Sequence, residues 1–295
     1  MTLREALRAA ERELAEAGCE TPGLDARVLL EHVTGYDTAA LVVRDGEEIG
    51  DRGKRFLELV QRRRGREPVA YLIGHKEFFS LRFDVGPEVL VPRPETELLV
   101  ETCLRELVQS GSRDSPTQIA DVGTGSGAIA VSVAAEVRAG RGGSAPVCLL
   151  AIDRCAQALA VARANAQRIL SSGGPPLGHL SLLQGDLTRA LRAASLDFLL
   201  ANPPYLSPRE LAGAPPELGF EPWLALAGGS DDGLGVVRDL LEEAQRVLRP
   251  TGLFLCEVGS SQGEEVASLA GRMGFSGVEV IRDLEGRPRL LRAGR

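Results

Sequence analysis

Apolar residues recur at helical spacing in the first part of the chain. In the first predicted helix they stand three or four positions apart, with charged residues between them, at Leu3, Leu7, Ala10, Leu14 and Ala17. The same pattern predicts helices over 24–33 and 52–64. Gly18 and Gly35 follow the first two helices as stop signals. We therefore predict a small helical domain over residues 1–75.

The hydrophobic period then shortens to two. Apolar residues alternate with polar ones at Leu81, Phe83 and Val85, which predicts a strand. The pair Gly86-Pro87 has the composition of a turn, and the apolar run Val89–Val91 follows it. We interpret this segment as a β-hairpin inside a linker over residues 76–93.

From residue 94 onward, predicted helices and strands alternate. Short apolar runs predict buried strands over 119–122, 147–152, 180–183, 196–200, 253–258, 278–281 and 289–291. Helical patterns occur over 96–108, 128–137, 155–170 and 233–248. This alternation predicts an α/β fold, with a mostly parallel sheet of seven strands and helices on both of its faces. The predicted second domain covers residues 94–295.

The composition and net charge indicate which classes of partner the protein binds. The chain has 295 residues, of which 44% are hydrophobic, and its formal net charge is −7 at pH 7. An acidic protein is a poor candidate for gripping duplex nucleic acid, because that affinity depends largely on neutralising phosphates. We therefore expect no direct nucleic-acid partner.

Signals for metal binding, membrane insertion and export are weak in this sequence. The five cysteines show no C-x-x-C spacing and the three histidines lie far apart, so we expect no metal site. No apolar stretch approaches the length of a membrane span. The segment 1–18 is amphipathic and rich in Glu, unlike a signal or transit peptide. We expect a cytoplasmic protein without a membrane partner.

A glycine-rich turn follows the first predicted strand of the sheet. It reads Asp121-Val122-Gly123-Thr124-Gly125-Ser126-Gly127. Glycines at every second position let the backbone turn tightly and approach a ligand closely. In a doubly wound sheet such a turn lies at the carboxyl end of the strands, where ligands bind. The next two strands lead to Asp153 and Asp186, whose carboxylates suit ribose hydroxyls and the exocyclic amine of adenine.

The spacing of these glycines separates two classes of cofactor. G-x-G-x-G differs from the dinucleotide fingerprint G-x-G-x-x-G, in which a helix N-terminus holds a pyrophosphate. S-adenosylmethionine has a ribose and an adenine but no phosphate, so the shorter pattern suits it. We predict this cofactor, with S-adenosylhomocysteine as product. The predicted binding residues are Asp121, Gly123, Thr124, Gly125, Ser126, Gly127, Asp153 and Asp186.

The fourth predicted strand of the sheet ends in Asn202-Pro203-Pro204-Tyr205. If the strand order reverses between the first and fourth strands, this turn faces the glycine-rich turn, and Asn202 also borders the cofactor. An amide NH2 is a poor nucleophile because its lone pair is delocalised. The Asn202 side-chain oxygen and the Pro203 carbonyl can each accept one N–H and orient such a nitrogen. We predict methyl transfer to a planar NH2 group, with Asn202, Pro203 and Tyr205 as catalytic residues and Pro204 beside the substrate.

These motifs resemble those of class I methyltransferases that act on exocyclic or amide nitrogens. Other segments narrow the resemblance to the release-factor glutamine methyltransferases (the HemK family), over nearly the whole chain: Pro68–Gly74, Phe78–Val85, Val91–Glu97, Phe220–Pro222 and Asp232–Leu234. The Pro-Arg-Pro-Glu-Thr segment is the most specific of them. The resemblance implies a Rossmann-like catalytic sheet and an N-terminal helical domain that recognises the substrate.

The resemblance also implies a substrate and further site residues. The substrate would be the glutamine in the Gly-Gly-Gln loop of class 1 peptide chain release factors. Arg93 and Glu95 would border it, and the alternative for these two residues is a structural ion pair at the domain joint. Many relatives have an aromatic residue where this chain has Leu187, which would pack against the adenine instead.

Several alternatives stay open at this point. The Asn-Pro-Pro-Tyr motif suits adenine equally well, so a nucleic-acid base flipped onto Tyr205 is a rival substrate. A glutamine of a ribosomal protein is another, and a non-catalytic binding module is a third reading. The basic run 62–66 is either a solvated helix end or a docking surface for an acidic partner. Trp223 lies either in the core or over the pocket.

Overall fold

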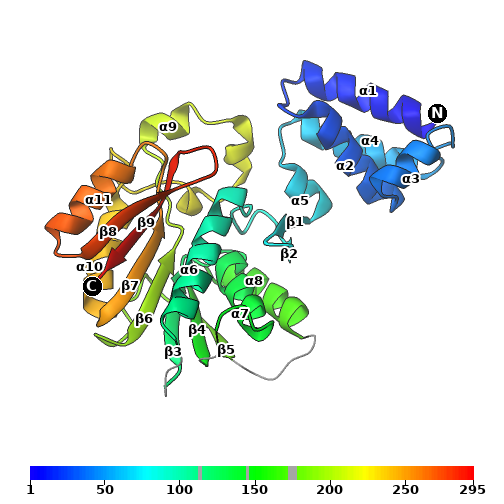
Figure 1. The fold of residues 1–295 in the computed structure, drawn as a ribbon. Coiled ribbons are helices and arrows are strands. Elements are labelled where there is room, and N and C mark those ends of the chain that lie inside the picture. The colour runs from blue at the N-terminus through cyan, green and yellow to red at the C-terminus, as the bar shows by residue number, and fades with distance from the viewer. Residues whose placement is uncertain (112–114, 144–145, 172–177) are drawn as a thin grey trace. The chain divides into compact units, whose positions relative to one another are not determined.

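The chain folds into two compact units in a computed structural model, which describes residues 1–111, 115–143, 146–171 and 178–295 (Figure 1). Among the described residues, the first unit contains Met1–His75 and Pro215–Phe220. The second unit contains Lys76–Ala214 and Glu221–Arg295. The segment 215–220 therefore belongs to the first unit although the chain on both sides of it belongs to the second.

The first unit is helical. Its elements are α1 (Leu3–Glu16), α2 (Pro22–Thr34), α3 (Thr38–Val43), α4 (Arg52–Arg64), α5 (Val69–Ile73) and the 3-10 helix η2 (Pro216–Phe220). Helix α1 begins at Thr2, whose side chain accepts from the Glu5 amide while the Glu5 carboxylate accepts from the Thr2 amide, so two backbone donors are satisfied. The predicted helices are present. Helices α3 and α5 were not predicted because five or six residues are too few to establish a period.

The basic end of α4 is involved in ion pairs inside the first unit. Arg63 is buried, and its guanidinium lies 2.8 Å from the Asp25 carboxylate and 2.9 Å from that of Glu217. Arg66 also pairs with Glu217, at 2.8 Å. Arg62 and Arg64 are exposed, as a solvated helix end predicts, whereas the buried Arg63 does not fit that interpretation. This arginine instead helps to hold α2 and the segment 215–220 on α4.

The hairpin after the first unit has a different turn from the predicted one. It pairs β1 (His75–Phe78) with β2 (Leu81–Asp84), and the residues after Gly86-Pro87 form no strand. Phe79 and Ser80 make the turn with φ of 51° and 57°, the left-handed backbone that two-residue hairpin loops require. The predicted position was wrong because neither residue is a glycine or asparagine, so neither signals such a turn.

The second unit is built on one sheet that, over the described residues, has seven strands in the order β5-β4-β3-β6-β7-β9-β8. The strands are β3 (Thr117–Val122), β4 (Val147–Asp153), β5 (Gly178–Gln184), β6 (Leu196–Ala201), β7 (Leu248–Glu257), β8 (Ser276–Arg282) and β9 (Pro288–Gly294). Strands β3 to β7 pair in parallel, and β9 runs antiparallel between β7 and β8. The predicted α/β fold with a mostly parallel sheet is confirmed.

Helices cover both faces of the sheet (Figure 1). They are α6 (Glu97–Gln109), α7 (Ala128–Arg138), α8 (Ala156–Leu170), α10 (Gly235–Val247) and α11 (Gly263–Arg272), with the short α9 (Pro208–Ala212), η1 (Pro94–Thr96) and η3 (Trp223–Ala225) in the loops. Apolar residues of α6 and α7 share a core with one face of β3, and those of α10 and α11 share a second core with the other. All of β6 is buried, as expected of a strand covered on both sides.

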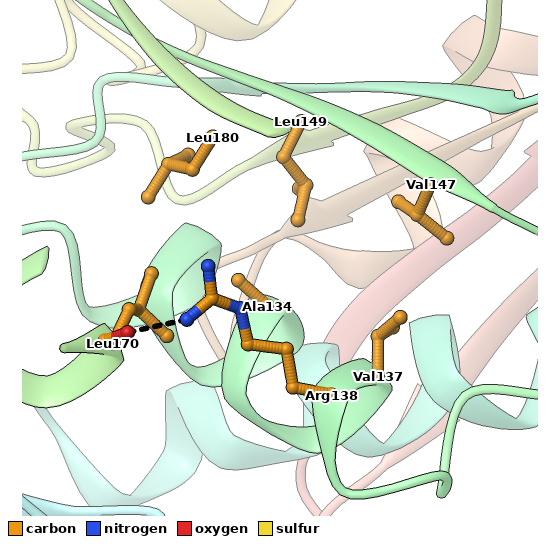
Figure 2. Close-up of a pocket in the computed structure, with 7 residues that line it drawn as sticks. All are labelled: Ala134, Val137, Arg138, Val147, Leu149, Leu170 and Leu180. Atoms are coloured by element: carbon orange, nitrogen blue, oxygen red, sulfur yellow. Dashed lines mark hydrogen bonds between the residues drawn. The ribbon is translucent and has the colours of Figure 1, made fainter. Parts of the chain in front are cut away.

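Packing leaves a small apolar gap at the amino end of β4 (Figure 2). Ala134 of α7, Leu149 of β4 and Leu180 of β5 line it, and Arg138 reaches across to donate to the Leu170 carbonyl. Parallel α/β sheets bind ligands at the carboxyl ends of their strands. This gap lies at the other end of β4 and is a packing defect of the core.

The topology brings two turns of the second unit together. Strand β3 lies between β4 and β6. The chain continues from β3 to β4 and β5 on one side and then to β6 on the other side, so the strand order reverses at β3. Val122 and Ala201, the last residues of β3 and β6, lie opposite each other in the sheet. The glycine-rich turn and the Asn-Pro-Pro-Tyr turn therefore begin side by side, at the end of the sheet where ligands bind in such folds.

Candidate active site

The glycine-rich turn has a backbone that only glycine adopts freely. Gly123, Gly125 and Gly127 have φ of 74°, 56° and 83°. A Cβ on Gly127 would lie 3.2 Å from that of Ala162 in α8, so this glycine also lets α7 pack closely on α8. A Cβ on Gly123 would lie 4.0 Å from the Asn202 carbonyl oxygen. The two turns thus approach each other through their backbones.

Asp121 is a buried carboxyl beneath this turn. Its Oδ2 accepts from the Thr124 hydroxyl at 2.6 Å and from the Ala130 amide at 3.2 Å, whereas its buried Oδ1 has no hydrogen-bond partner among the described residues. Burial raises the pKa of Asp121 to about 7, against the opposing effect of those two hydrogen bonds. A buried oxygen in need of a donor is suited to a cationic ligand group.

Asp153 at the end of β4 is held by the backbone around it. One carboxylate oxygen accepts from the Gly125 amide and the other from the Cys155 amide, each at 2.9 Å. Since each carboxylate oxygen has two lone-pair directions, both keep capacity for a further donor. Asp153 therefore stabilises the glycine-rich turn and still presents an acceptor at the strand end.

The predicted adenine residues lie after β5. Asp186 is exposed and forms an ion pair with Arg189. Leu187 has φ of 51° and packs, half-buried, against the core that α10 and α11 form. The left-handed backbone at Leu187 turns the chain sharply after Asp186. An ion-paired Asp186 must share its carboxylate if it is to bind an amine as well.

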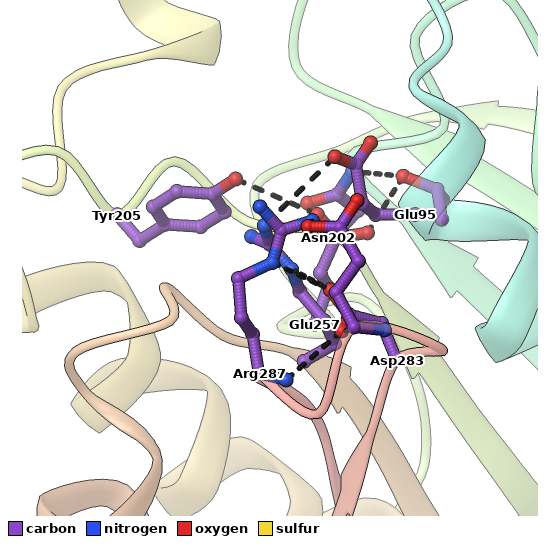
Figure 3. Close-up of polar contacts among 9 residues, drawn as sticks. Glu95, Asn202, Tyr205, Glu257, Asp283 and Arg287 are labelled. Carbon is purple, nitrogen blue, oxygen red and sulfur yellow. Dashed lines mark hydrogen bonds and ion pairs between the residues drawn. The ribbon is translucent and has the colours of Figure 1, made fainter.

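A chain of hydrogen bonds surrounds Asn202 (Figure 3). Its Nδ2 donates to the Thr96 hydroxyl at 3.1 Å, and that hydroxyl donates to Glu257 Oε2 at 2.6 Å. The Tyr205 hydroxyl points toward Glu257 Oε1 from the other side, at 3.5 Å. Burial raises the pKa of Glu257 to about 7, and it also raises the pKa of Tyr205. Pro203 lies between Asn202 and Tyr205 in the sequence and is buried. Its ring fixes the backbone φ angle, which makes the turn rigid.

Arg93 and Glu95 make separate ion pairs. Arg93 pairs with the buried Glu221, whose other oxygen accepts from the Val91 amide at 3.0 Å. Glu95 lies 3.8 Å from Arg289. Arg93 and Glu95 therefore do not form an ion pair with each other. Each of the two residues instead has its own ion-pair partner.

Two other residues differ from the sequence interpretation. Trp223 is 64% exposed, so of its two alternatives the position in the core is wrong. Glu257 was missed altogether, although the signal exists as a carboxyl directly after the apolar run Leu253–Cys256. Burying a charged residue at the carboxyl end of a strand costs free energy, and residues buried in this way often have a functional role.

Metal ligands and membrane spans are absent from the parts of the chain that are described. Across the described ranges, no group of three or more His, Cys, Asp or Glu side chains could hold a metal ion. Within the same ranges, no helix combines the length and the apolar composition that crossing a bilayer requires.

Comparisons with known proteins agree on one kind of enzyme. The family model described as the PrmC N-terminal domain matches residues 5–74, and the methyltransferase small domain matches residues 94–214. The release factor glutamine methyltransferase of Moorella thermoacetica is 42% identical, with 100% of this chain and 99% of the relative covered. The protein of the same name from Nitratidesulfovibrio vulgaris is 40% identical, with 100% and 95% covered.

A solved structure resembles the fold. The hMettl16 catalytic domain, crystallised in complex with MAT2A 3'UTR hairpin 1, aligns with a TM-score of 0.56 and 15% identity, over 96% of this chain and 90% of that one. At this identity the likeness concerns the fold alone.

Proposed function

We propose, since the chain belongs to the family of release factor glutamine methyltransferases, that it methylates the glutamine of the Gly-Gly-Gln loop in class 1 peptide chain release factors. The acceptor is the side-chain amide nitrogen and the methyl donor is S-adenosylmethionine. The observation that carries the proposal is the Asn202 turn beside the glycine-rich turn, where a Cβ on Gly123 would lie 4.0 Å from the Asn202 carbonyl oxygen. An amide held at Asn202 would therefore lie next to a cofactor held at the glycines.

The residues around the glycine-rich turn fit the cofactor. The unpaired buried Oδ1 of Asp121 suits an ammonium group, and the Asp153 carboxylate retains acceptor capacity for ribose hydroxyls. Asp186 and Leu187 would border the adenine. Backbone groups of Gly123–Gly127 would lie against the ligand without intervening side chains. When bound, S-adenosylmethionine supplies an electrophilic methyl group and leaves as S-adenosylhomocysteine.

Residues of the Asn-Pro-Pro-Tyr turn would orient the substrate amide. The Asn202 Oδ1 and the Pro203 carbonyl each accept one N–H of the glutamine, which fixes the nitrogen in line for attack. The same acceptors stabilise positive charge as it develops on that nitrogen. The methylated nitrogen is acidic and loses its proton without a strong base. Pro204 and Tyr205 flank the planar amide, and Arg93 and Glu95 form the rim.

The proposal extends to the rest of the chain. The helical domain over residues 1–75 recognises the release factor, the hairpin linker over 76–93 joins it to the catalytic domain over 94–295, and the reaction takes place in the cytoplasm, where release factors act. Nucleic acid and a glutamine of a ribosomal protein are the alternative substrates.

Methyl transfer from labelled S-adenosylmethionine tests the function. Purified unmethylated release factor should take up label, and a release factor with the loop glutamine replaced should not. Nucleic acid and ribosomal proteins in parallel reactions should stay unlabelled. Label on either of those alone would keep the chemistry but overturn the proposed substrate.

Replacing Asp153 with alanine should weaken S-adenosylmethionine binding. One charged acceptor is lost, and the Gly125 amide that it holds is released, so we expect the dissociation constant to rise about 10- to 100-fold. Isothermal titration calorimetry measures this. Asp186→Ala is the matched control on the next strand and should cost less, because Asp186 is exposed and already paired. Unchanged affinity in Asp153→Ala would mean that the ribose lies elsewhere.

Cofactor affinity should rise with pH. Burial raises the pKa of Asp121 to about 7, so the carboxylate that attracts an ammonium group is a minor species at pH 6 and the major one at pH 8. We expect the dissociation constant to fall about fivefold between pH 6 and pH 7, in proportion to the competent fraction. Asp121→Asn should abolish the dependence and Glu257→Gln should keep it. A flat profile in the wild type would contradict the role of Asp121.

The same raised pKa values predict how stability changes with pH. In the absence of cofactor, Asp121 and Glu257 bind their protons more tightly in the folded protein than in the unfolded chain. Folding therefore takes up protons between the ordinary carboxyl range and about pH 7. The free energy of unfolding should fall as pH rises through that window. Urea denaturation at several pH values measures it, and the double variant Asp121→Asn, Glu257→Gln should flatten the curve.

A further inference from the structure

The hydrogen bonds behind Asn202 form a chain with a defined direction. The chain of hydrogen bonds ends at Glu257, the last residue of β7. This residue is 2% exposed. Thr96 connects it to Asn202 through bonds of 2.6 Å and 3.1 Å, and Thr96 itself is buried. The three residues are distant in the sequence: Thr96 ends η1, Asn202 directly follows β6, and Glu257 ends β7. Figure 3 shows Asn202 and Glu257 close together.

The chemistry of the two outer groups decides which way each bond points. An ionised carboxylate can only accept, so the hydroxyl proton of Thr96 must go to Glu257. Because its only proton points to Glu257, the Thr96 oxygen can only accept a hydrogen bond from Asn202. An asparagine amide facing such an oxygen must present its NH2 group, because its carbonyl oxygen would meet a second acceptor. The Asn202 Oδ1 is consequently turned away from Thr96.

We propose that Thr96 and Glu257 are positioning residues that fix the Asn202 amide with its carbonyl oxygen toward the substrate nitrogen. The kcat measurement that tests this inference rests on the proposed function. The orientation of the Asn202 amide is a property of the protein alone. Without the chain, the Asn202 amide can flip and offer its NH2 group to the substrate NH2. Two donors would then face each other, and the nitrogen would not be held in line.

An assay at pH 8 keeps Glu257 charged although burial raises its pKa. Arg289 of β9 opposes the effect of burial on the pKa of Glu257, and Glu95 and the Tyr205 hydroxyl also lie close enough to influence it. At pH 8, above the pKa of about 7, the carboxylate form prevails. The variants are therefore compared at that pH.

Thr96→Val removes the hydroxyl at nearly constant shape, and Thr96→Ser restores it. We expect Thr96→Val to lower kcat about tenfold, the worth of one oriented hydrogen bond, with the dissociation constant for S-adenosylmethionine unchanged. Thr96→Ser should recover most of the rate. Thr102→Val, at another fully buried threonine of the same unit, should leave turnover unchanged. Glu257→Met removes the acceptor at the far end of the chain and should also lower kcat.

Two readouts separate positioning from general damage. In the Asn202→Ala background, Thr96→Val should cause no further loss, because a residue that acts through Asn202 has nothing left to orient. The side-chain NH2 signals of Asn202 in nitrogen-15 NMR, assigned by their loss in Asn202→Ala, should shift in Thr96→Val and remain in place in Thr96→Ser.

The outcomes divide cleanly between the two proposals. A shifted NH2 signal together with a tenfold lower kcat in Thr96→Val supports the positioning chain. An unchanged signal, an unchanged kcat, or an additive loss in the double variant overturns it. If the wild type transfers no methyl group to release factor, the proposed function fails, and the NMR signals alone then decide the orientation of Asn202.

Discussion

Asn202→Ala should lower kcat for methylation of release factor by about 10²- to 10³-fold, while the affinity for S-adenosylmethionine stays within about twofold of the wild type. The alanine removes the acceptor that orients the substrate nitrogen and stabilises its developing charge. It leaves Asp121, Asp153 and the glycine backbone untouched, so cofactor binding has no reason to change. Single-turnover kinetics beside calorimetric titration of the cofactor measure both quantities.

Tyr205→Phe is the matched control in the same turn. The tyrosine hydroxyl contributes a 3.5 Å contact with Glu257, which is at the limit of a hydrogen bond, while the ring that would flank the substrate is retained. We expect a loss of kcat below about threefold, less than one good hydrogen bond contributes. Normal turnover by Asn202→Ala would remove the proposed role of that residue, whatever Tyr205→Phe does.

Arg63→Met should destabilise the helical unit by about 3–5 kcal/mol. The side chains of Arg63 and Asp25 are 7% and 8% exposed, and Arg63 also pairs with Glu217. Methionine fills much of the space but leaves two carboxylates without this partner, one of them buried. Hydrogen exchange of amides in α2 and α4 of the full chain measures the local free energy of opening.

Arg55→Met provides the comparison on the same helix. Arg55 pairs with Glu58 at 3.4 Å, but these side chains are 54% and 49% exposed, so the loss should be below about 1 kcal/mol. Equal effects of the two substitutions would contradict the buried pair at Arg63. A large effect of Arg63→Met alone would establish that Arg63 stabilises the fold of the helical unit.

Much of the catalytic unit could be predicted from the sequence because its signals are local. Runs such as Phe198–Ala201 are apolar throughout, as expected of a strand covered on both faces, and glycines mark the turn at 123–127. The motifs at Asp121 and Asn202 lie at strand ends, so the topology of a doubly wound sheet brings them together.

Other features depend on contacts that no local pattern encodes. The turn at Phe79 and Ser80 takes a left-handed backbone without glycine. Helix α11 has only Val266, Ala270 and Gly263 buried, which is a weak period to recognise. The role of Thr96 becomes apparent only when Glu257, distant in sequence, lies 2.6 Å away. Sequence thus predicts the acceptors of the site but not what orients them.

Mass-spectrometric mapping of release factor after reaction locates the transferred methyl group. We expect one methyl group on the side-chain amide nitrogen of the Gly-Gly-Gln glutamine after reaction with the wild type, and none above background after reaction with Asn202→Ala. A methyl group on another residue, or equal modification by both proteins, would contradict this expectation.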